Sequence, residues 1–277
     1  MSVLNEAGLL PGLLENIYNS VDEIVIVDGG PNGPSTDGTK EIAKGCDKVL
    51  YQSGTYAMRD GAWDMATQRN EGISAANGDV FMFLSADMYF ANLESLREVV
   101  DADQYKIIFC TTIEFWIDMT RVRLYSADTD VLTVPSNILQ PLAIDSSYAP
   151  YCEENGSFQL EGASHNDRIL LPQTIKYHLG WIRPFSQQVQ KHICHVKQHR
   201  WGELGEKLLQ GSDRAMDQQW IKHVMSYEGI PSIAFSGALP PELEQHKDMR
   251  FDDGADEVQK EFERKYNVSL LRAKGEE

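Results

Sequence analysis

With 277 residues, of which 42% are hydrophobic and 24% charged, the chain has the composition of a folded globular protein, which excludes wholesale disorder. Its 42 acidic residues outnumber its 25 basic ones and give a formal net charge of −17, which disfavours nucleic acid as a partner. No apolar run reaches the ~18 residues that cross a bilayer, and the start lacks an apolar leader, so we expect no transmembrane segment and a cytoplasmic protein.

Strand and helix patterns alternate along the first part of the chain. Short apolar or β-branched runs favour strands, and apolar residues spaced three or four apart favour amphipathic helices. In chain order, strands are predicted at 1–4, 23–28, 49–50, 80–84 and 106–112, and helices at 9–18, from a cap at 36–39 through 43, at 63–76 and at 93–100. This alternation predicts an α/β fold with a Rossmann-like, mostly parallel sheet that carries helices on both faces.

The pattern becomes irregular after about residue 115. We expect antiparallel strands at 121–125 and 130–134, loops over 139–164, and helices at 186–199, 202–209 and 213–227. A charged tail is expected from about residue 240 onward. The chain is therefore predicted to have one α/β sheet followed by an irregular, partly helical C-terminal region.

Polar side chains follow the predicted strands at the points where these strands end. The first strand is followed by Asn5 and Glu6, the second ends in Asp28, and the strand at 80–84 is followed by Ser85 and Asp87. In an open α/β sheet, ligands bind at the carboxyl ends of the strands. Carboxylates gathered there repel one another unless a cation lies between them, and Mg²⁺ or Mn²⁺ carrying a diphosphate meets that need.

Five blocks of the first 90 residues resemble the opening of family-2 glycosyltransferases, which have the GT-A fold. In order they are Asn5-Glu6, 21–28 (VDEIVIVD), 35–39 (STDGT), 68–72 (QRNEG), and 76–79 (ANGD) with the strand that leads to Asp87. The resemblance implies that residues 1–115 form the nucleotide-sugar-binding half, 116–240 the acceptor side and helical cap, and 241–277 a charged tail. It also implies a glycosyltransferase, for hexosyl or pentosyl groups and of the inverting type.

By this resemblance, three residues approach the nucleoside of the donor. Asp28 matches the acid that hydrogen-bonds the base, and Asn5 and Glu6 match the first-strand residues beside the nucleoside. The implied donor is a UDP-, GDP- or dTDP-sugar, and the implied acceptor is a hydroxyl of a glycan, a lipid-linked glycan or a small molecule.

The resemblance places a divalent metal, Mn²⁺ or Mg²⁺, on the diphosphate of this donor. Asp87 matches the second acid of the family's Asp-X-Asp motif, which binds the metal, while Ser85 replaces the first acid. Arg69 is expected on the diphosphate side. A segment at 176–184 (KYHLGWIRP) resembles a downstream block of many family-2 enzymes, and His178 in it is a second candidate metal ligand.

An inverting transferase also needs a carboxylate that takes the proton of the acceptor hydroxyl. Glu153 and Glu154 are the best-placed acids by their order along the chain, with Asp167 as a rival.

Other interpretations remain open at this stage. Asp28 alone would be a helix cap, Arg69 could pair with an acid on its own helix, and His178 could be a hydrogen-bonded structural residue. The same fold could glycosylate a protein or a modified DNA base, and the Ser85 replacement allows a nucleotide-sugar-binding module without turnover. A nucleotidyltransferase is disfavoured because residues 5–12 lack a glycine-rich, basic loop.

Overall fold

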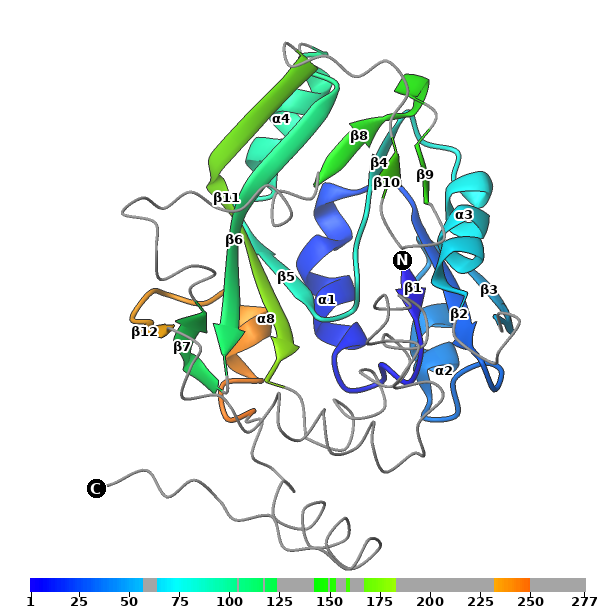
Figure 1. Ribbon diagram of the computed structural model, residues 1–277, viewed down its shortest axis with the longest axis horizontal. Helices are drawn as coiled ribbons and strands as arrows, with labels where there is room; N and C mark the ends of the chain where they lie inside the picture. Colours follow the sequence, from blue (N-terminus) through cyan, green and yellow to red (C-terminus); the bar gives the residue numbers. More distant parts are fainter. Residues whose placement is uncertain are drawn as a thin grey trace, which may run out of the picture.

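The computed structural model describes residues 1–56, 64–103, 105–116, 118–123, 142–148, 150–152, 158–159, 167–182 and 232–249, which form an α/β fold (Figure 1). Its strands are β1 (Ser2–Val3), β2 (Ile24–Gly30), β3 (Val49–Thr55), β4 (Val80–Met82), β5 (Met88–Ala91), β6 (Ile107–Trp116), β7 (Asp118–Arg123), β8 (Ala143–Asp145), β9 (Tyr151–Cys152), β10 (Phe158–Gln159), β11 (Arg168–Trp181) and β12 (Ser232–Ala234). The helices are α1 (Leu10–Ile17), α2 (Thr39–Lys44), α3 (Met65–Ala75), α4 (Glu94–Asp101) and α8 (Pro241–Glu244), with 3₁₀ turns at Tyr18–Ser20 and Ser146–Tyr148. The predicted α/β alternation of the first 115 residues is confirmed.

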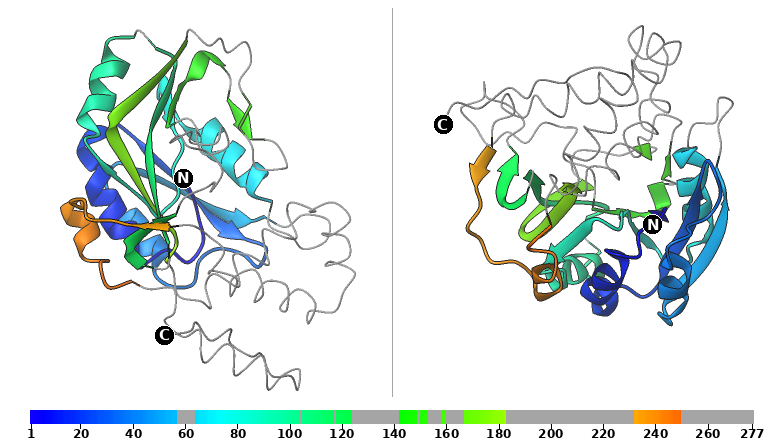
Figure 2. Two further views of the ribbon diagram at one scale, coloured as in Figure 1. Left: turned by 60° about the vertical axis from the view of Figure 1, so that its left-hand side comes forward. Right: turned by 90° about the horizontal axis from the view of Figure 1, so that it is seen from below.

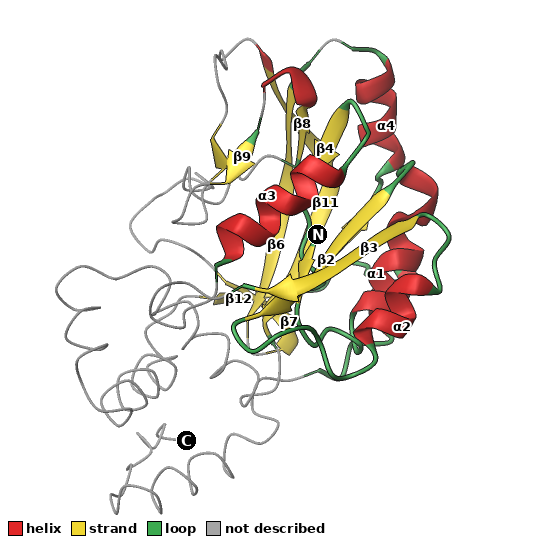
Figure 3. Cartoon of the chain, turned by 90° about the vertical axis from the view of Figure 1, so that its right-hand side faces the viewer, coloured by secondary structure: helices red, strands yellow, loops and turns green. Residues whose placement is uncertain are grey.

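The N-terminal strands form a parallel sheet in the order β1-β2-β3. The central strand, β2, is β-branched and apolar until Asp28, and it is buried along most of its length, as a strand covered on both faces should be. Helix α3 lies on one face of these strands, and α1 and α2 lie on the other (Figure 3). This part of the molecule has the two-sided α/β layering expected from the sequence.

A second sheet contains the strands that follow α3. Its strands run in the order β12-β7-β6-β11-β5, and β8 bridges β6 to β4. β6 and β11 are parallel, while β5, β7 and β8 run antiparallel to their neighbours. The carboxyl ends of β2, β6 and β11 and the start of β5 face the same, lower edge in Figure 1.

The parallel and mixed sheets are separate in the part of the chain that the structure describes. The strand predicted at 80–84 forms as β4, but it pairs with β8 and not with β1. The loops expected over 139–164 also differ from the structure, because β8, β9 and β10 lie within that segment. The helices expected between 186 and 227 and the strand expected at 130–134 lie outside the described residues.

Helix α1 packs its apolar stripe into the core. Leu10, Leu13 and Ile17 each have at most 1% of their surface exposed, and they stand at the helical spacing noted in the sequence.

The segment expected as a charged tail starts with a helix, because its first residues form α8. The fully buried Leu243 of this helix lies on the side that packs against α1 (Figure 2). Among the described residues, no helix has the length and apolar character needed to span a bilayer.

Helix α3 is fastened to the parallel strands by one buried amide. Nε2 of Gln68 donates to the backbone oxygens of Val27 at 2.7 Å, Gly29 at 3.1 Å and Val3 at 3.3 Å, and the side chain is fully buried. Gln68 therefore joins β1, β2 and α3 directly behind the carboxyl ends of the two strands. This contact gives a structural reason for the Gln at the head of the QRNEG block.

We expect Gln68→Leu to lower the free energy of unfolding by about 2–4 kcal/mol, because an apolar side chain of similar size leaves these buried carbonyls without the amide donor. For a chain of this size the melting temperature should fall by roughly 5–10 °C. Thermal and urea unfolding measure the change. Gln173→Leu, at an exposed position of β11, is the matched control and should shift stability by less than about 0.5 kcal/mol; equal losses in both variants would contradict the assignment.

Candidate functional site

The loop after β1 is tied to the loop after β2 by side chains that the sequence had singled out. Asn5 has a left-handed backbone with φ of 54°, and its Oδ1 accepts from the Thr36 N–H at 2.9 Å. The Asn5 N–H donates to Oγ of Ser35 at 2.7 Å, and the same hydroxyl donates to Oδ1 of Asp28 at 2.5 Å. Asn5 and Asp28 are thus brought into one hydrogen-bonded unit through Ser35.

Asp28 is fully buried in this unit and accepts three hydrogen bonds. Ser35 supplies its N–H at 3.1 Å in addition to its hydroxyl, and the Tyr51 hydroxyl donates to Oδ2 at 2.6 Å. Burial, together with the hydrogen bond to Asp28 and its charge, raises the pKa of Tyr51. An ionised carboxylate has about four lone-pair positions, so Oδ2 retains room for one more donor. Ser35 and Tyr51 were not identified from the sequence, although Ser35 lies in the STDGT block.

Glu6 and Asp37 belong to the same region through backbone contacts. The Glu6 N–H donates to Oγ1 of the buried Thr39 at 2.8 Å, and Asp37 accepts from the Ala7 N–H at 3.0 Å and from the Thr39 hydroxyl at 2.6 Å. Although its partial burial alone would raise the pKa of Asp37, these hydrogen bonds lower it below its usual value. Asp37 therefore fixes the loop, as a capping carboxylate does.

A second group of side chains forms a row across three neighbouring strands. His178 on β11 is in register with Glu114 on β6 and with Met88 on β5, which Asp87 precedes. The His178 Nδ1 lies 2.9 Å from Oε1 of Glu114, and its Nε2 lies 3.7 Å from Oδ2 of Asp87. The structure therefore unites two residues predicted from the sequence, Asp87 and His178, and adds Glu114, which was not predicted.

The row is largely enclosed, and its charges influence one another. Asp87 is 1% and Glu114 8% exposed, whereas 22% of the His178 side chain remains exposed. Burial alone would lower the pKa of His178, but the neighbouring charges of Asp87 and Glu114 and the hydrogen bond to Glu114 raise it. The buried Lys176 lies two residues earlier on β11, and burial lowers its pKa although the charges of Glu114 and Asp87 act in the opposite direction.

Backbone contacts hold His178 beside Asp87. The Leu179 N–H donates to the carbonyl of Asp87 at 2.8 Å, which ties β11 to the start of β5. A Cβ placed on Gly180 would lie 2.6 Å from both Cε1 and Nε2 of the His178 ring. The absence of a side chain at Gly180, in the HLGW segment, therefore makes room for the imidazole ring.

The donor atoms in this row fit a divalent cation that is shared with a diphosphate. Neighbouring ligands at about 2.1 Å from an octahedral ion stand roughly 3 Å apart, close to the 3.7 Å between Asp87 and His178. Within the described segments, no three His, Cys, Asp or Glu side chains are grouped so as to hold a metal by themselves. One carboxylate and one imidazole, completed by phosphate oxygens, are a suitable set for Mn²⁺.

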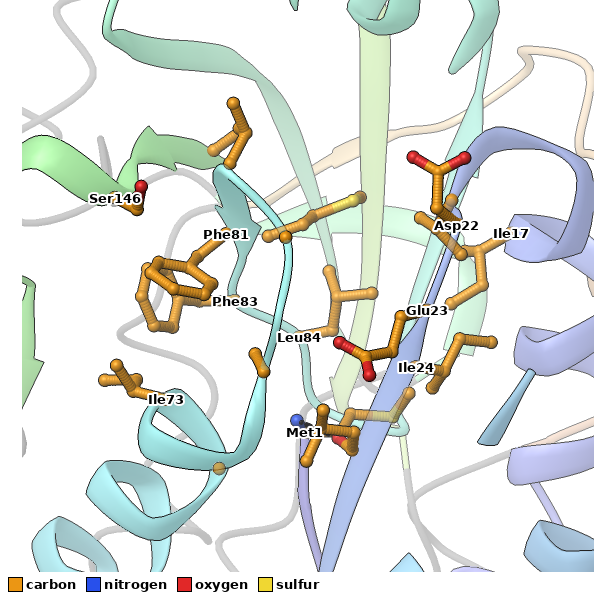
Figure 4. A pocket seen from close by; sticks show the side chains of 18 of the residues that line it. Met1, Ile17, Asp22, Glu23, Ile24, Ile73, Phe81, Phe83, Leu84 and Ser146 are labelled. Carbon is orange, nitrogen blue, oxygen red and sulfur yellow. Dashed lines mark hydrogen bonds between the residues drawn. The ribbon is translucent and has the colours of Figure 1, made fainter. Parts of the chain in front are cut away.

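Arg69 and Ser85 lie in the wall of a cavity of about 720 Å³ between the start of β2 and the β4 segment. Figure 4 shows Phe81 and Phe83 on the β4 side and Glu23 on the β2 side. Nη1 of Arg69 approaches Sγ of Cys152 at 3.8 Å. Neither Asp28 nor Asp87 lines this cavity, and it opens where the parallel strands begin, so we locate the candidate site at the opposite, carboxyl edge.

The remaining candidates concern the general base. Glu153 and Glu154 lie outside the described residues. Asp167 directly precedes β11, and its carbonyl accepts from the Lys106 N–H at 3.0 Å. Their neighbours on or beside β6, Lys106 and Glu114, are eight residues apart, which is roughly 26 Å at about 3.3 Å per residue. Asp167 is therefore at the far end of the strand and is ruled out as a partner of the Asp87–His178 row.

Comparison with known proteins gives one family match and one curated relative. The family model described as Glycosyl transferase family 2 matches residues 1–143, which is just over half of the chain. A TPR repeat-containing protein of Synechococcus elongatus is 37% identical over 87 residues. That alignment covers 31% of this chain and 19% of the relative, so the chain spans about a fifth of the relative's length.

Among solved structures, the chain is similar to TarS of S. aureus. TarS 1–349 has 14% identity and a TM-score of 0.42, with 81% of this chain and 77% of that chain covered. Its complex with UDP has 13% identity, a TM-score of 0.42 and coverage of 82% and 78%. At these scores the likeness supports no statement about the site.

Proposed function

Because the chain belongs to glycosyl transferase family 2, we propose that it transfers a sugar from a nucleoside-diphosphate donor to a hydroxyl group of an acceptor. The observation that carries this proposal is the approach of Asp87 to His178 at the carboxyl edge of the strands. These two side chains supply the hard oxygen and the imidazole nitrogen that a cation on a diphosphate accepts.

In this proposal the two polar groups of the site divide the donor between them. Asp28, oriented by Ser35 and Tyr51, accepts a hydrogen bond from an N–H of the base. Asp87 and His178 would hold Mn²⁺ or Mg²⁺, which supplies positive charge beside the leaving diphosphate. Asn5 and Glu6 shape the floor under the nucleoside, because their backbones are fixed to Ser35 and Thr39.

The transfer itself needs one further carboxylate. We propose an inverting reaction in which Glu153 or Glu154 takes the proton of the attacking hydroxyl as the new glycosidic bond forms. The acceptor is a glycan, a lipid-linked glycan or a small molecule. Arg69 lines the cavity at the opposite edge of the strands, so it has no part in this proposal.

A thermal-shift panel of UDP-, GDP- and dTDP-sugars, with and without Mn²⁺, tests the proposal. A donor that binds only the folded chain adds about 2.7 kcal/mol of stability at 100 times its Kd, which corresponds to a rise of roughly 5–10 °C for this size. We expect one nucleotide class to give this rise, and to give more of it with Mn²⁺. Release of the nucleoside diphosphate on prolonged incubation should accompany it. If no sugar nucleotide changes the melting temperature at millimolar concentration, the proposed function is wrong.

A further inference from the structure

Glu114 is the member of the buried row that the proposed chemistry does not use. It lies on β6 beside His178, away from Asp87, and Oε1 is 2.9 Å from Nδ1 of the imidazole. A metal ion can use only one imidazole nitrogen, and the partner of the other nitrogen decides which one is available. With Glu114 on Nδ1, the nitrogen left facing Asp87 is Nε2.

From this geometry we propose that Glu114 is a positioning residue, which holds the His178 ring so that Nε2 and the Asp87 carboxylate converge on one cation. The inference rests on the proposed function, since it concerns the metal of the donor diphosphate. Glu114 itself does not touch donor or acceptor in this arrangement. Its contribution is the orientation of the ring.

Two features of the structure keep the His178 imidazole ring from adopting other positions. Gly180 leaves space for Cε1 and Nε2, so the ring is packed over a glycine on one side and hydrogen-bonded to Glu114 on the other. The backbone bond from Leu179 to Asp87 fixes the strand that carries the ring. With the main chain fixed, the remaining freedom is rotation of the side chain, and the Glu114 contact removes it.

Mn²⁺ affinity, measured by electron paramagnetic resonance with saturating UDP, GDP or dTDP, tests this role without requiring turnover. Glu114→Leu removes the acceptor at nearly constant volume and should weaken Mn²⁺ binding about 10- to 100-fold. Glu114→Gln keeps an acceptor for the Nδ1 proton and should stay within about threefold of the wild type. In a His178→Ala background, Glu114→Leu should cause no further loss, because its effect passes through the ring.

Gly180→Ala tests the same ring from the other side and leaves every charge in place. The added Cβ should displace the imidazole and weaken Mn²⁺ binding by at least about 10-fold, again only while His178 is present. This variant decides the question if Glu114→Leu does not fold. Glu23→Gln, which loses a carboxylate at the other end of β2, is the matched control and should leave Mn²⁺ affinity unchanged.

The outcomes separate the inference from the function. If the wild-type chain binds Mn²⁺ with a nucleoside diphosphate but Glu114→Leu and Gly180→Ala bind it equally well, the positioning role is overturned and the proposed function stands. A Glu114→Leu loss of the same size in the His178→Ala background also overturns the role, since it would show a direct effect of charge. If the wild type binds no Mn²⁺ with any of the three nucleotides, the positioning role is overturned, whereas the proposed function is decided by the thermal-shift panel.

Discussion

Replacement of Asp87 by Asn should abolish the metal-dependent part of donor binding. Asp87 is 1% exposed and is the carboxylate nearest to Nε2 of His178, so the variant keeps the shape of the site but removes the anionic ligand. Removing a residue that only hydrogen-bonds a metal ligand weakens metal binding about 10- to 100-fold. Removing the ligand itself should therefore weaken metal binding at least about 100-fold. Transfer activity should fall by a similar factor, because the diphosphate then leaves without a cation beside it.

The measurement is the melting temperature with the donor, with and without Mn²⁺, for the wild type and Asp87→Asn. We expect the rise that depends on Mn²⁺ to vanish in the variant, while the metal-independent rise from the nucleoside remains. Asp22→Asn, at an exposed acid that pairs with Arg97, is the matched control for loss of one negative charge. An unchanged Mn²⁺-dependent rise in Asp87→Asn would remove Asp87 from the metal site.

The fold of the N-terminal half could be predicted because its signals are local. The β-branched run that ends in Asp28 and the apolar stripe of α1 each determine an element within about ten residues of sequence. The long strand β11 was not predicted. Its stretch contains Pro172 and Gly180, and it becomes a strand by pairing with β6, about sixty residues earlier. Such pairing is a tertiary effect that outweighs local propensity.

The candidate site, like the fold, could be predicted from the sequence only in part. Asp87 and His178 were identified through the resemblance of two separate blocks, and the structure brings these two side chains together. Glu114 was overlooked because it stands alone in a strand of apolar and hydroxyl residues, where no motif marks it. The available signal was physical, since a lone carboxylate in a buried strand requires a partner. Tyr51 was missed for a similar reason, because its contact to Asp28 follows from the register of β2 and β3.

The second large effect is expected at the nucleoside end of the donor. There, Asp28→Asn should change which base the protein prefers. The N–H and hydroxyl of Ser35 both donate to Oδ1, so the amide oxygen of the new side chain should occupy this position and its amide nitrogen should replace Oδ2. The group that faces the base then changes from an acceptor to a donor. A base with an N–H at that edge, such as uracil, thymine or guanine, meets a second donor, whereas cytosine offers an acceptor there.

We therefore expect affinity for the preferred donor, a UDP-, dTDP- or GDP-sugar, to fall by about 100-fold or more, because buried polar groups without partners discriminate strongly. The corresponding CDP-sugar should bind the variant better than it binds the wild type. Isothermal titration with matched UDP and CDP, or with the nucleotide pair that suits the wild type, measures both changes. Stability should fall by about 1–3 kcal/mol, since charged hydrogen bonds from Ser35 and Tyr51 become neutral.

Tyr51→Phe distinguishes recognition of the base from general weakening of the loop. It removes one of the three hydrogen bonds to Asp28 but leaves the carboxylate, so it should lower stability by about 1–2 kcal/mol without any shift toward CDP. Because Asp28 is fully enclosed, a base reaches Oδ2 only when groups that cover it move aside. Equal loss of uridine and cytidine nucleotides in Asp28→Asn would assign this carboxylate to the support of the loop, with the base read by other groups.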